Sequence, residues 1–168
     1  MSQQVKGIAE SINIMGNRSG SAMKERNPAP IQEMAKEETA ARASYLDLNI
    51  GPARKDGTEL MPWVVETVEG TVDTPLCLDT TNTDAMIAGF KAVKNKEAAI
   101  MNSISAQPER MEALIPVAAE AKCNVIALLW GPDGWLYGAN GSTTGGTISS
   151  AVTKGVNFQG QCIWRYHP

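Results

Sequence analysis

The sequence predicts an α/β fold built from repeated strand–helix units, and three observations favour it. Short apolar runs rich in β-favouring residues alternate with amphipathic segments from Lys6 to Trp130. Several of these runs are almost uninterrupted, as expected for parallel strands that are covered on both faces. Residues that commonly cap helices come directly before the amphipathic segments. The predicted strands are Val5–Asn13, Ser44–Ile50, Pro75–Thr80, Ala98–Ser103 and Asn124–Trp130.

The predicted helices are located mainly by their first residues. Asn27 and Asp56 each offer a side-chain oxygen just before apolar residues begin to recur at helical spacing. Asn82 and Ser105 have the same position before the next two helices. Pro116 lies inside the last of them, where it should kink the helix or leave a carbonyl without a partner.

A run of such units forms either an open parallel sheet or a closed eight-stranded barrel, and a barrel typically needs ~250 residues. The chain has 168 residues, so we expect a partial barrel of about four βα units plus a fifth strand, within residues 1–134. Residues 135–168 contain no Asp or Glu but six glycines, and they lack helical periodicity. We expect an irregular C-terminal tail there, either poorly ordered or with a hairpin of Thr147–Val152 and Cys162–Tyr166.

Composition excludes several functional classes. Hydrophobic residues make up 43% and charged residues 20% of the chain, which is typical of a globular protein. The net charge of -3, without a basic block, does not favour binding to nucleic acid or to anionic lipid. The absence of a long apolar run or a signal sequence predicts a cytoplasmic protein. With three dispersed cysteines and one histidine, no disulfide framework and no directly bound metal is expected, and Cys77 and Cys123 are interpreted as small buried hydrophobes.

Polar residues recur where the predicted strands end, which is where ligands bind in parallel α/β folds. One polar residue of this kind is more often a helix cap, but polar residues at four successive strand ends favour a shared role. Carboxylates and carboxamides together can recognise a heterocycle rich in hydrogen-bond donors and acceptors. The stretch NIMGNRSGS is a weaker candidate, for phosphate, because it lacks the order of a P-loop. The candidate residues are Glu10, Asn13, Asp47, Asn49, Asp79 and Asn102.

Four segments resemble a known family in order and spacing. They read ERNPAPIQEMA, YLDLNIGPARKDG, PLCLDTTN and MNSISAQPERMEALIPVA, within Gly7–Gly134. They are similar to the methyltetrahydrofolate:corrinoid methyltransferases, pterin-binding proteins with a dihydropteroate synthase-like TIM-barrel-type fold. The resemblance implies methyltetrahydrofolate as substrate and transfer of its N5 methyl group to the cobalt of a corrinoid (cobalamin) carried by a partner protein. Because a partial barrel leaves exposed strand edges that a second copy could close, we also expect a homodimer.

The resemblance implies roles for individual residues. Asp79 and Asn102 match the residues that hydrogen-bond the pterin ring, and Asp47 and Asn49 match polar positions near it. Glu10 and Asn13 match more loosely, because the family's first-strand motif GERIN reads GIAESIN here, with serine in place of arginine. The family's asparagine near N5 comes from a later strand without counterpart in this chain, so no catalytic residue is assigned.

Two alternatives remain beside the methyltransferase. The family similarity ends at Gly134, which suggests a displaced reading frame and a non-catalytic pterin-binding protein or an inactive truncated half-barrel. A dihydropteroate synthase-like enzyme is the other alternative. Those synthases carry a DIGGEST-type loop after the second strand, where this chain reads LDLNIGPARKDG, and this difference disfavours them.

Overall fold

The computed structural model describes residues 6–105, 107–130, 136–140, 145–148, 156–159 and 162–166. The chain divides into two compact units. The first comprises Met1–Ile104 and Pro108–Ile126, and the second comprises Ser105–Gln107 and Ala127–Pro168.

Parallel strands form the centre of the first unit. Strands β1 (Ile8–Ala9), β2 (Tyr45–Asn49), β3 (Leu76–Asp79) and β4 (Ile100–Ser105) pair in parallel in chain order, and β5 (Asn124–Trp130) follows β4. Helices separate the strands along the chain, so the predicted fold class, a partial (βα) barrel, is confirmed. The helices are α1 (Asn17–Glu25), α2 (Pro28–Ala40), α3 (Gly57–Glu69), α4 (Thr83–Ala92) and α5 (Pro108–Ala121), with a 3-10 turn η1 at Lys96–Ala98.

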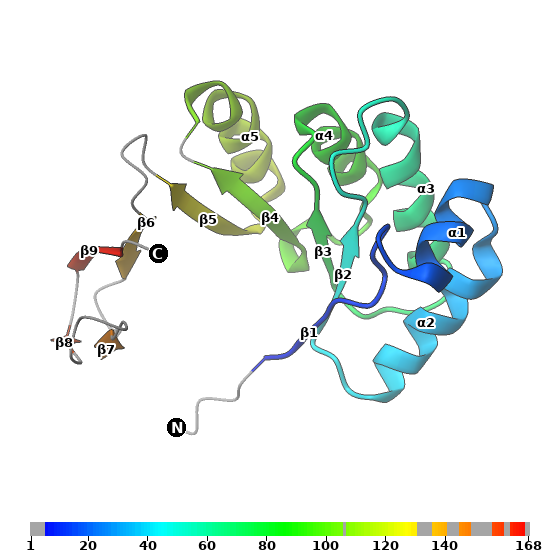
Figure 1. The fold of residues 1–168 in the computed structure, drawn as a ribbon, viewed down its shortest axis with the longest axis horizontal. Coiled ribbons are helices and arrows are strands. Elements are labelled where there is room, and N and C mark those ends of the chain that lie inside the picture. Colours follow the sequence, from blue (N-terminus) through cyan, green and yellow to red (C-terminus); the bar gives the residue numbers. More distant parts are fainter. Residues whose placement is uncertain are drawn as a thin grey trace. The chain divides into compact units, whose positions relative to one another are not determined.

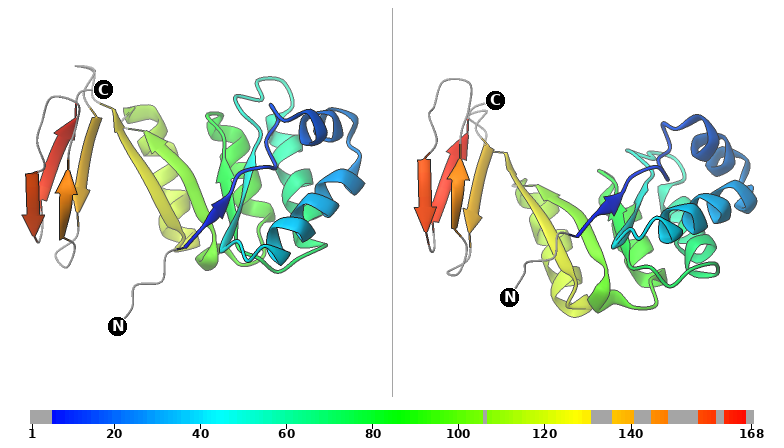
Figure 2. Two further views of the ribbon diagram at one scale, coloured as in Figure 1. Left: turned by 60° about the horizontal axis from the view of Figure 1, so that its bottom comes forward. Right: turned by 90° about the horizontal axis from the view of Figure 1, so that it is seen from below.

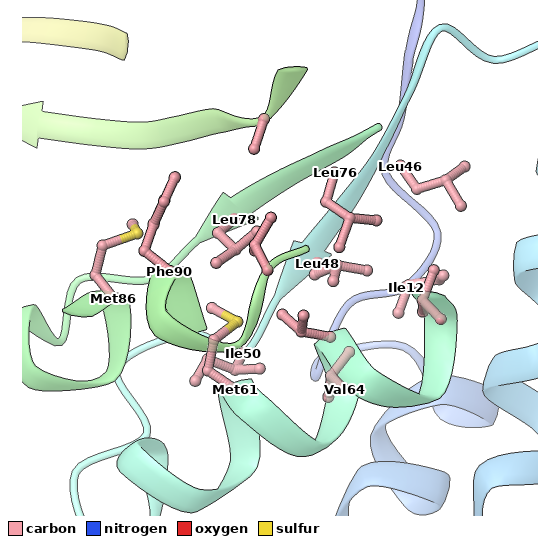
Figure 3. Packing of buried hydrophobic residues seen from close by; sticks show 14 of the residues in the cluster. Ile12, Leu46, Leu48, Ile50, Met61, Val64, Leu76, Leu78, Met86 and Phe90 are labelled. Carbon is pink, nitrogen blue, oxygen red and sulfur yellow. The ribbon is translucent and has the colours of Figure 1, made fainter. Parts of the chain in front are cut away.

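The core lies between the strands and the helices, and in β2 and β3 the leucines that fill it alternate with residues of the opposite face. Helices α2 to α5 lie along one side of the row of strands (Figure 1), and two further views show the same arrangement (Figure 2). In β2 and β3 every second residue is a fully buried leucine, and these leucines pack with Met61 and Val64 of α3 (Figure 3). Side chains of a strand point alternately to its two faces, so the residues between the leucines face away from the helices.

Two of the predicted helix caps are confirmed. The Asn27 side chain accepts a hydrogen bond from the backbone N–H of Ala29, and that of Asn82 accepts one from Ala85. Asp56 occupies the N-cap position of α3 without such a bond and instead pairs with Arg26 at 2.9 Å. The prediction for Ser105 was wrong, because this residue ends β4 and α5 begins only at Pro108.

The N-terminal strand is shorter than predicted. Ala9 pairs with Leu46 and Asn13 pairs with Asn49, so β1 has one more residue than β2 between these two pairs. Such an extra residue is a bulge, which interrupts the ladder. At the bulge the Ser11 backbone N–H donates to the Glu38 side chain instead of to a strand carbonyl. The ladder is therefore limited to Ile8–Ala9 and an isolated bridge at Asn13.

Helix α1 was not predicted. The stretch NIMGNRSGS, considered for phosphate binding, leads into this helix and contains its first turns. Ser19 is buried there and donates to the carbonyl of Asn13 at 2.6 Å. Its hydroxyl therefore ties the helix to the preceding loop.

The second unit is antiparallel. Strand β6 (Leu136–Asn140) pairs with the end of β5 on one side and with β9 (Cys162–Tyr166) on the other. Strands β7 (Gly145–Ile148) and β8 (Val156–Gln159) pair with each other. Strand β9 has the bounds of the fragment considered for a hairpin, but its partner is β6; residues 149–152 of the other fragment lie outside the described residues. Among the residues that the structure describes, no helix is long and apolar enough to cross a membrane.

Candidate functional site

The polar residues of β2, β3 and β4 lie on the face opposite the helices. Asp47 and Asn49 alternate with the leucines of β2, and Asp79 alternates with those of β3. The register makes Asn49 the direct neighbour of Asp79, and Asp79 the direct neighbour of Asn102. The structure thus brings four of the six predicted residues together at the carboxyl ends of three adjacent strands.

Hydrogen bonds join these residues in two pairs. The Asn49 amide donates from Nδ2 to Oδ2 of Asp79 at 2.6 Å and accepts the Gly51 backbone N–H at its Oδ1. Asn102 Nδ2 lies 3.5 Å from Asp47 Oδ1, which is a long contact. Within the described part of the chain, no donor reaches the second oxygen of Asp79. Asn49 is therefore occupied in holding Asp79, and Asp79 and Asn102 offer the polar atoms best suited to meet a ligand.

The electrostatics of the site differ from those of a solvated surface. Burial, followed by the charges of Asp47 and Glu10, raises the pKa of Asp79 from 3.8 to about 6, although the Arg110 guanidinium opposes the change. Burial also raises the pKa of Asp47, against hydrogen bonds from Cys77 and Asn102 that lower it. The ionised form of such partly buried carboxylates is stabilised when a ligand supplies hydrogen-bond donors.

Cys77 is buried as predicted, but it is not a simple hydrophobe. It alternates with the leucines of β3, so it shares the polar face, and it is the register partner of Asp47. Burial raises the pKa of its thiol, and hydrogen bonding to Asp47 raises it further. The thiol is therefore protonated at neutral pH and donates to the Asp47 carboxylate. Cys123 is only half-buried and packs against the edge of the core.

Asn13 and Glu10, the two candidates that match the family less closely, lie outside this hydrogen-bonded group. The Asn13 side chain accepts the backbone N–H of Met15 at 2.9 Å, so it stabilises the turn that leads into α1. Glu10 is exposed at the bulge of β1, and its charge raises the pKa values of both Asp47 and Asp79. Asn13 is thus a local turn residue beside Asn49, whereas Glu10 contributes negative potential to the polar face.

Comparison with known proteins decides the family. Residues 9–152 match the family described as pterin binding enzyme. The chain belongs to the pterin-binding enzyme family. A methylcorrinoid:tetrahydrofolate methyltransferase of Eubacterium limosum is 30% identical over 100 residues, which are 60% of this chain and 36% of that protein. The aligned part thus covers little more than a third of the relative, and the family resemblance inferred from the four motifs is confirmed.

One residue beside the polar face of this pterin-binding family member was missed by the sequence reasoning. Arg110, in the first turn of α5, is only 8% exposed. It donates three hydrogen bonds to the segment between β3 and the start of α4 and two to the Ser103 carbonyl of β4. In a sequence, an arginine near the start of a helix is usually interpreted as a charge exposed to solvent. The one available signal was its place in PERME, directly after the polar end of the fourth strand.

Gly51 shapes the loop after β2. Its φ of +59° is in the left-handed region, its N–H donates to Asn49, and its carbonyl accepts the Thr80 hydroxyl at 2.6 Å. A Cβ at this position would lie 3.3 Å from the Ile14 side chain. The turn thus connects the residues that follow β2 and β3.

Gly51→Ala is expected to lower the free energy of unfolding by about 1–2 kcal/mol, since a residue with a Cβ is strained in this conformation. Gly51→Asn is the matched control, because asparagine tolerates positive φ better than alanine. Urea denaturation of both variants measures the difference. Equal stability of Gly51→Ala and the wild type would contradict the role of the turn.

Among the residues that the structure describes, no group of three or more His, Cys, Asp or Glu side chains is arranged to hold a metal ion. The polar face combines carboxylates with carboxamides, and this donor set suits hydrogen bonding to a heterocycle.

Proposed function

We propose that the polar face formed by Asp47, Asn49, Asp79 and Asn102 binds the pterin ring of a tetrahydrofolate. The observation that carries the proposal is the direct pairing of Asp79 with Asn102 across β3 and β4, in a chain of the pterin-binding family. A pterin ring carries adjacent N–H donors and a carbonyl on one edge. A carboxylate accepts such donors, and an amide both donates to the carbonyl and accepts from the ring.

The proposed reaction is methyl transfer between N5 of the folate and the cobalt of a corrinoid, which a separate protein carries as co-substrate. The relative from Eubacterium limosum is named for transfer from methylcorrinoid to tetrahydrofolate. The direction that the family resemblance implies, from folate to corrinoid, passes through the same transition state in reverse. We therefore propose the reaction without assigning its direction.

The chemistry sets different tasks for the residues of the site. N5 is a poor leaving group as a neutral amine, so proton donation or a hydrogen bond to N5 must strengthen as the C–N bond breaks. Asp79 and Asn102 fix the ring so that the methyl group is aligned with the incoming cobalt. Asp79 thus acts as a positioning group, and the proposal assigns the proton to neither residue.

Titration with methyltetrahydrofolate tests the binding step. Asp79→Ala is expected to weaken binding roughly 10- to 100-fold, because it removes a hydrogen bond to a charged group, worth about 1.5–3 kcal/mol. Asn102→Ala removes a bond between neutral groups, worth about 0.5–1.5 kcal/mol, and is expected to weaken binding roughly 2- to 10-fold. Asp73→Ala, which alters an exposed aspartate at the other end of β3, is the matched control. Affinities equal to that of the wild type in both site variants would remove the site from consideration.

The methyl-transfer step and the assembly need separate measurements. Incubation with a reduced corrinoid protein and methyltetrahydrofolate, and with a methylated corrinoid protein and tetrahydrofolate, measures transfer in both directions. We also propose that the protein is a homodimer and that it lies in the cytoplasm. The mass of the protein in solution measures its oligomeric state. Folate binding without transfer would favour the non-catalytic alternative.

A further inference from the structure

We propose that Arg110 is the positioning residue of the pterin site, since it fixes the two strand ends that carry Asp79 and Asn102. This inference rests on the proposed function. The guanidinium joins the loop after β3 to β4, and two of its anchor points, Thr80 and Ser103, directly follow the two pterin-facing residues.

The contacts of Arg110 are directed at backbone carbonyls. Nη2 donates to the carbonyl of Thr80 at 2.7 Å, and Nη2 and Nε donate to that of Ser103 at 2.9 and 3.1 Å. Nη1 donates to the carbonyl of Thr81 at 2.9 Å and to the hydroxyl of Thr83 at 3.1 Å. Thr80 follows Asp79 and Ser103 follows Asn102, so one rigid group sets the spacing between the two residues.

A side chain other than arginine does not satisfy this geometry. The guanidinium is planar and carries five N–H donors in a fixed fork, whereas an ammonium group concentrates three donors on one atom. All five donors of Arg110 are used, counting the two bonds of Nη1 and the two of Nη2. Lysine would retain the charge but could not join β4 and the loop after β3 at once.

The charge of Arg110 has a second consequence for the site. Among the described residues no carboxylate forms an ion pair with this buried guanidinium, whereas Arg18 and Arg26 pair with carboxylates at the surface. Its positive charge instead acts on Asp79 through space and lowers the pKa of that carboxyl, against burial. Arg110 thereby favours the ionised form of the group proposed to accept pterin N–H donors.

Three variants of the full chain test this role: Arg110→Met, Arg110→Lys and Arg18→Met. Arg18 is the matched control, because it is also multiply bonded but lies at the surface, where it contacts Glu33 and Glu37. Methyltetrahydrofolate affinity is expected to fall about 10- to 100-fold in both Arg110 variants, since a displaced site residue costs up to about 100-fold, and to stay unchanged in Arg18→Met.

A second readout needs no folate. Carboxyl and amide NMR signals report the pKa of Asp79 and the environment of the Asn102 side chain in the free protein. Arg110→Met is expected to raise the pKa of Asp79 and to shift the Asn102 amide signals. Arg110→Lys is expected to keep the pKa of Asp79 closer to that of the wild type but still to shift the Asn102 amide signals. The pKa thus reports the effect of the positive charge, and the amide signals report the effect of the guanidinium's shape.

The outcomes distinguish the two proposals. A wild type that binds no folate would overturn the proposed function, while the NMR signals would still decide whether Arg110 fixes Asp79 and Asn102. Wild-type affinity together with unchanged signals in Arg110→Lys would overturn the positioning role. If Arg110→Met does not fold, Arg110→Lys alone tests the positioning role, because this variant keeps the buried positive charge and changes only the hydrogen-bonding geometry.

Discussion

Asp79→Asn is expected to weaken pterin binding and, at neutral pH, to make the free protein more stable. The variant keeps an oxygen that can accept the Asn49 amide, which now donates to Asp79 at 2.6 Å. It loses the negative charge that would accept the ring N–H groups, so affinity should fall roughly 10- to 100-fold, the equivalent of about 1.5–3 kcal/mol. Function and stability should therefore change in opposite directions.

The gain in stability follows from the raised pKa of Asp79. Between pH 3.8 and about 6 the native carboxyl binds a proton more tightly than the unfolded one. The wild type therefore loses stability as the pH rises through this window, and the loss persists above pH 6. Asp47 and Glu10 add to the effect and Arg110 opposes it. Asparagine has no charge to bury, so its advantage should disappear below pH 3.8.

Thermal unfolding of the wild type, Asp79→Asn and the exposed control Asp73→Asn on both sides of this window measures the effect. Folate affinity measured over the same pH range provides the companion result. Wild-type affinity should decline below about pH 6, where Asp79 becomes protonated, and the variant should lack this decline. A variant that is less stable than the wild type at neutral pH would show that the Asp79 carboxylate is stabilised, not strained, by its surroundings.

Gly20→Ala is expected to have the largest effect on stability. A Cβ at Gly20 would overlap the carbonyl oxygen of Ile14 and lie 3.1 Å from the carbonyl carbon. These are backbone atoms, and Ile14 is fixed to β2 by a hydrogen bond from its N–H to the carbonyl of Asn49 at 2.8 Å. Helix α1 would have to move away from the loop, at a cost of about 1–3 kcal/mol.

Gly7→Ala is the matched control for this substitution, because a Cβ at Gly7 would contact nothing within 4 Å. Urea denaturation of the two variants should separate them clearly, with the midpoint of Gly20→Ala well below that of Gly7→Ala. Similar midpoints would mean that α1 shifts at little cost, and that its packing on the loop is not a stabilising feature.

The strands that carry the site could be predicted because short apolar runs that end in polar residues recur along the chain. Asp47 lies between two leucines and Asp79 follows one, and the parallel register then places Asp79 beside Asn49. The apolar run of β5 even gives its bounds, Asn124–Trp130, correctly. Local pattern is sufficient where a residue's neighbours in sequence decide which face it occupies.

The remaining features depend on contacts between distant residues. The bulge in β1 follows from the bond between the Ser11 backbone and Glu38, which lies on α2. Helix α1 was hidden because glycine and serine dominate its start, and Gly20 is needed there for packing and not for a ligand. The five bonds of Arg110 join β4 to the loop after β3, whose bonded residues Thr80 and Thr81 are 30 and 29 residues from Arg110 in sequence, a relation that no local pattern contains.

The alternation of leucines with polar residues also protects the chain against pairing errors during folding. A slip of one residue in β2 would turn Asp47 and Asn49 toward α3 and expose Leu46 and Leu48 on the opposite face. Ionised groups among apolar side chains are strongly disfavoured, so the slipped arrangement would not compete with the native one. The residues proposed to recognise a pterin thus double as markers of strand register, and selection for binding would also preserve correct folding.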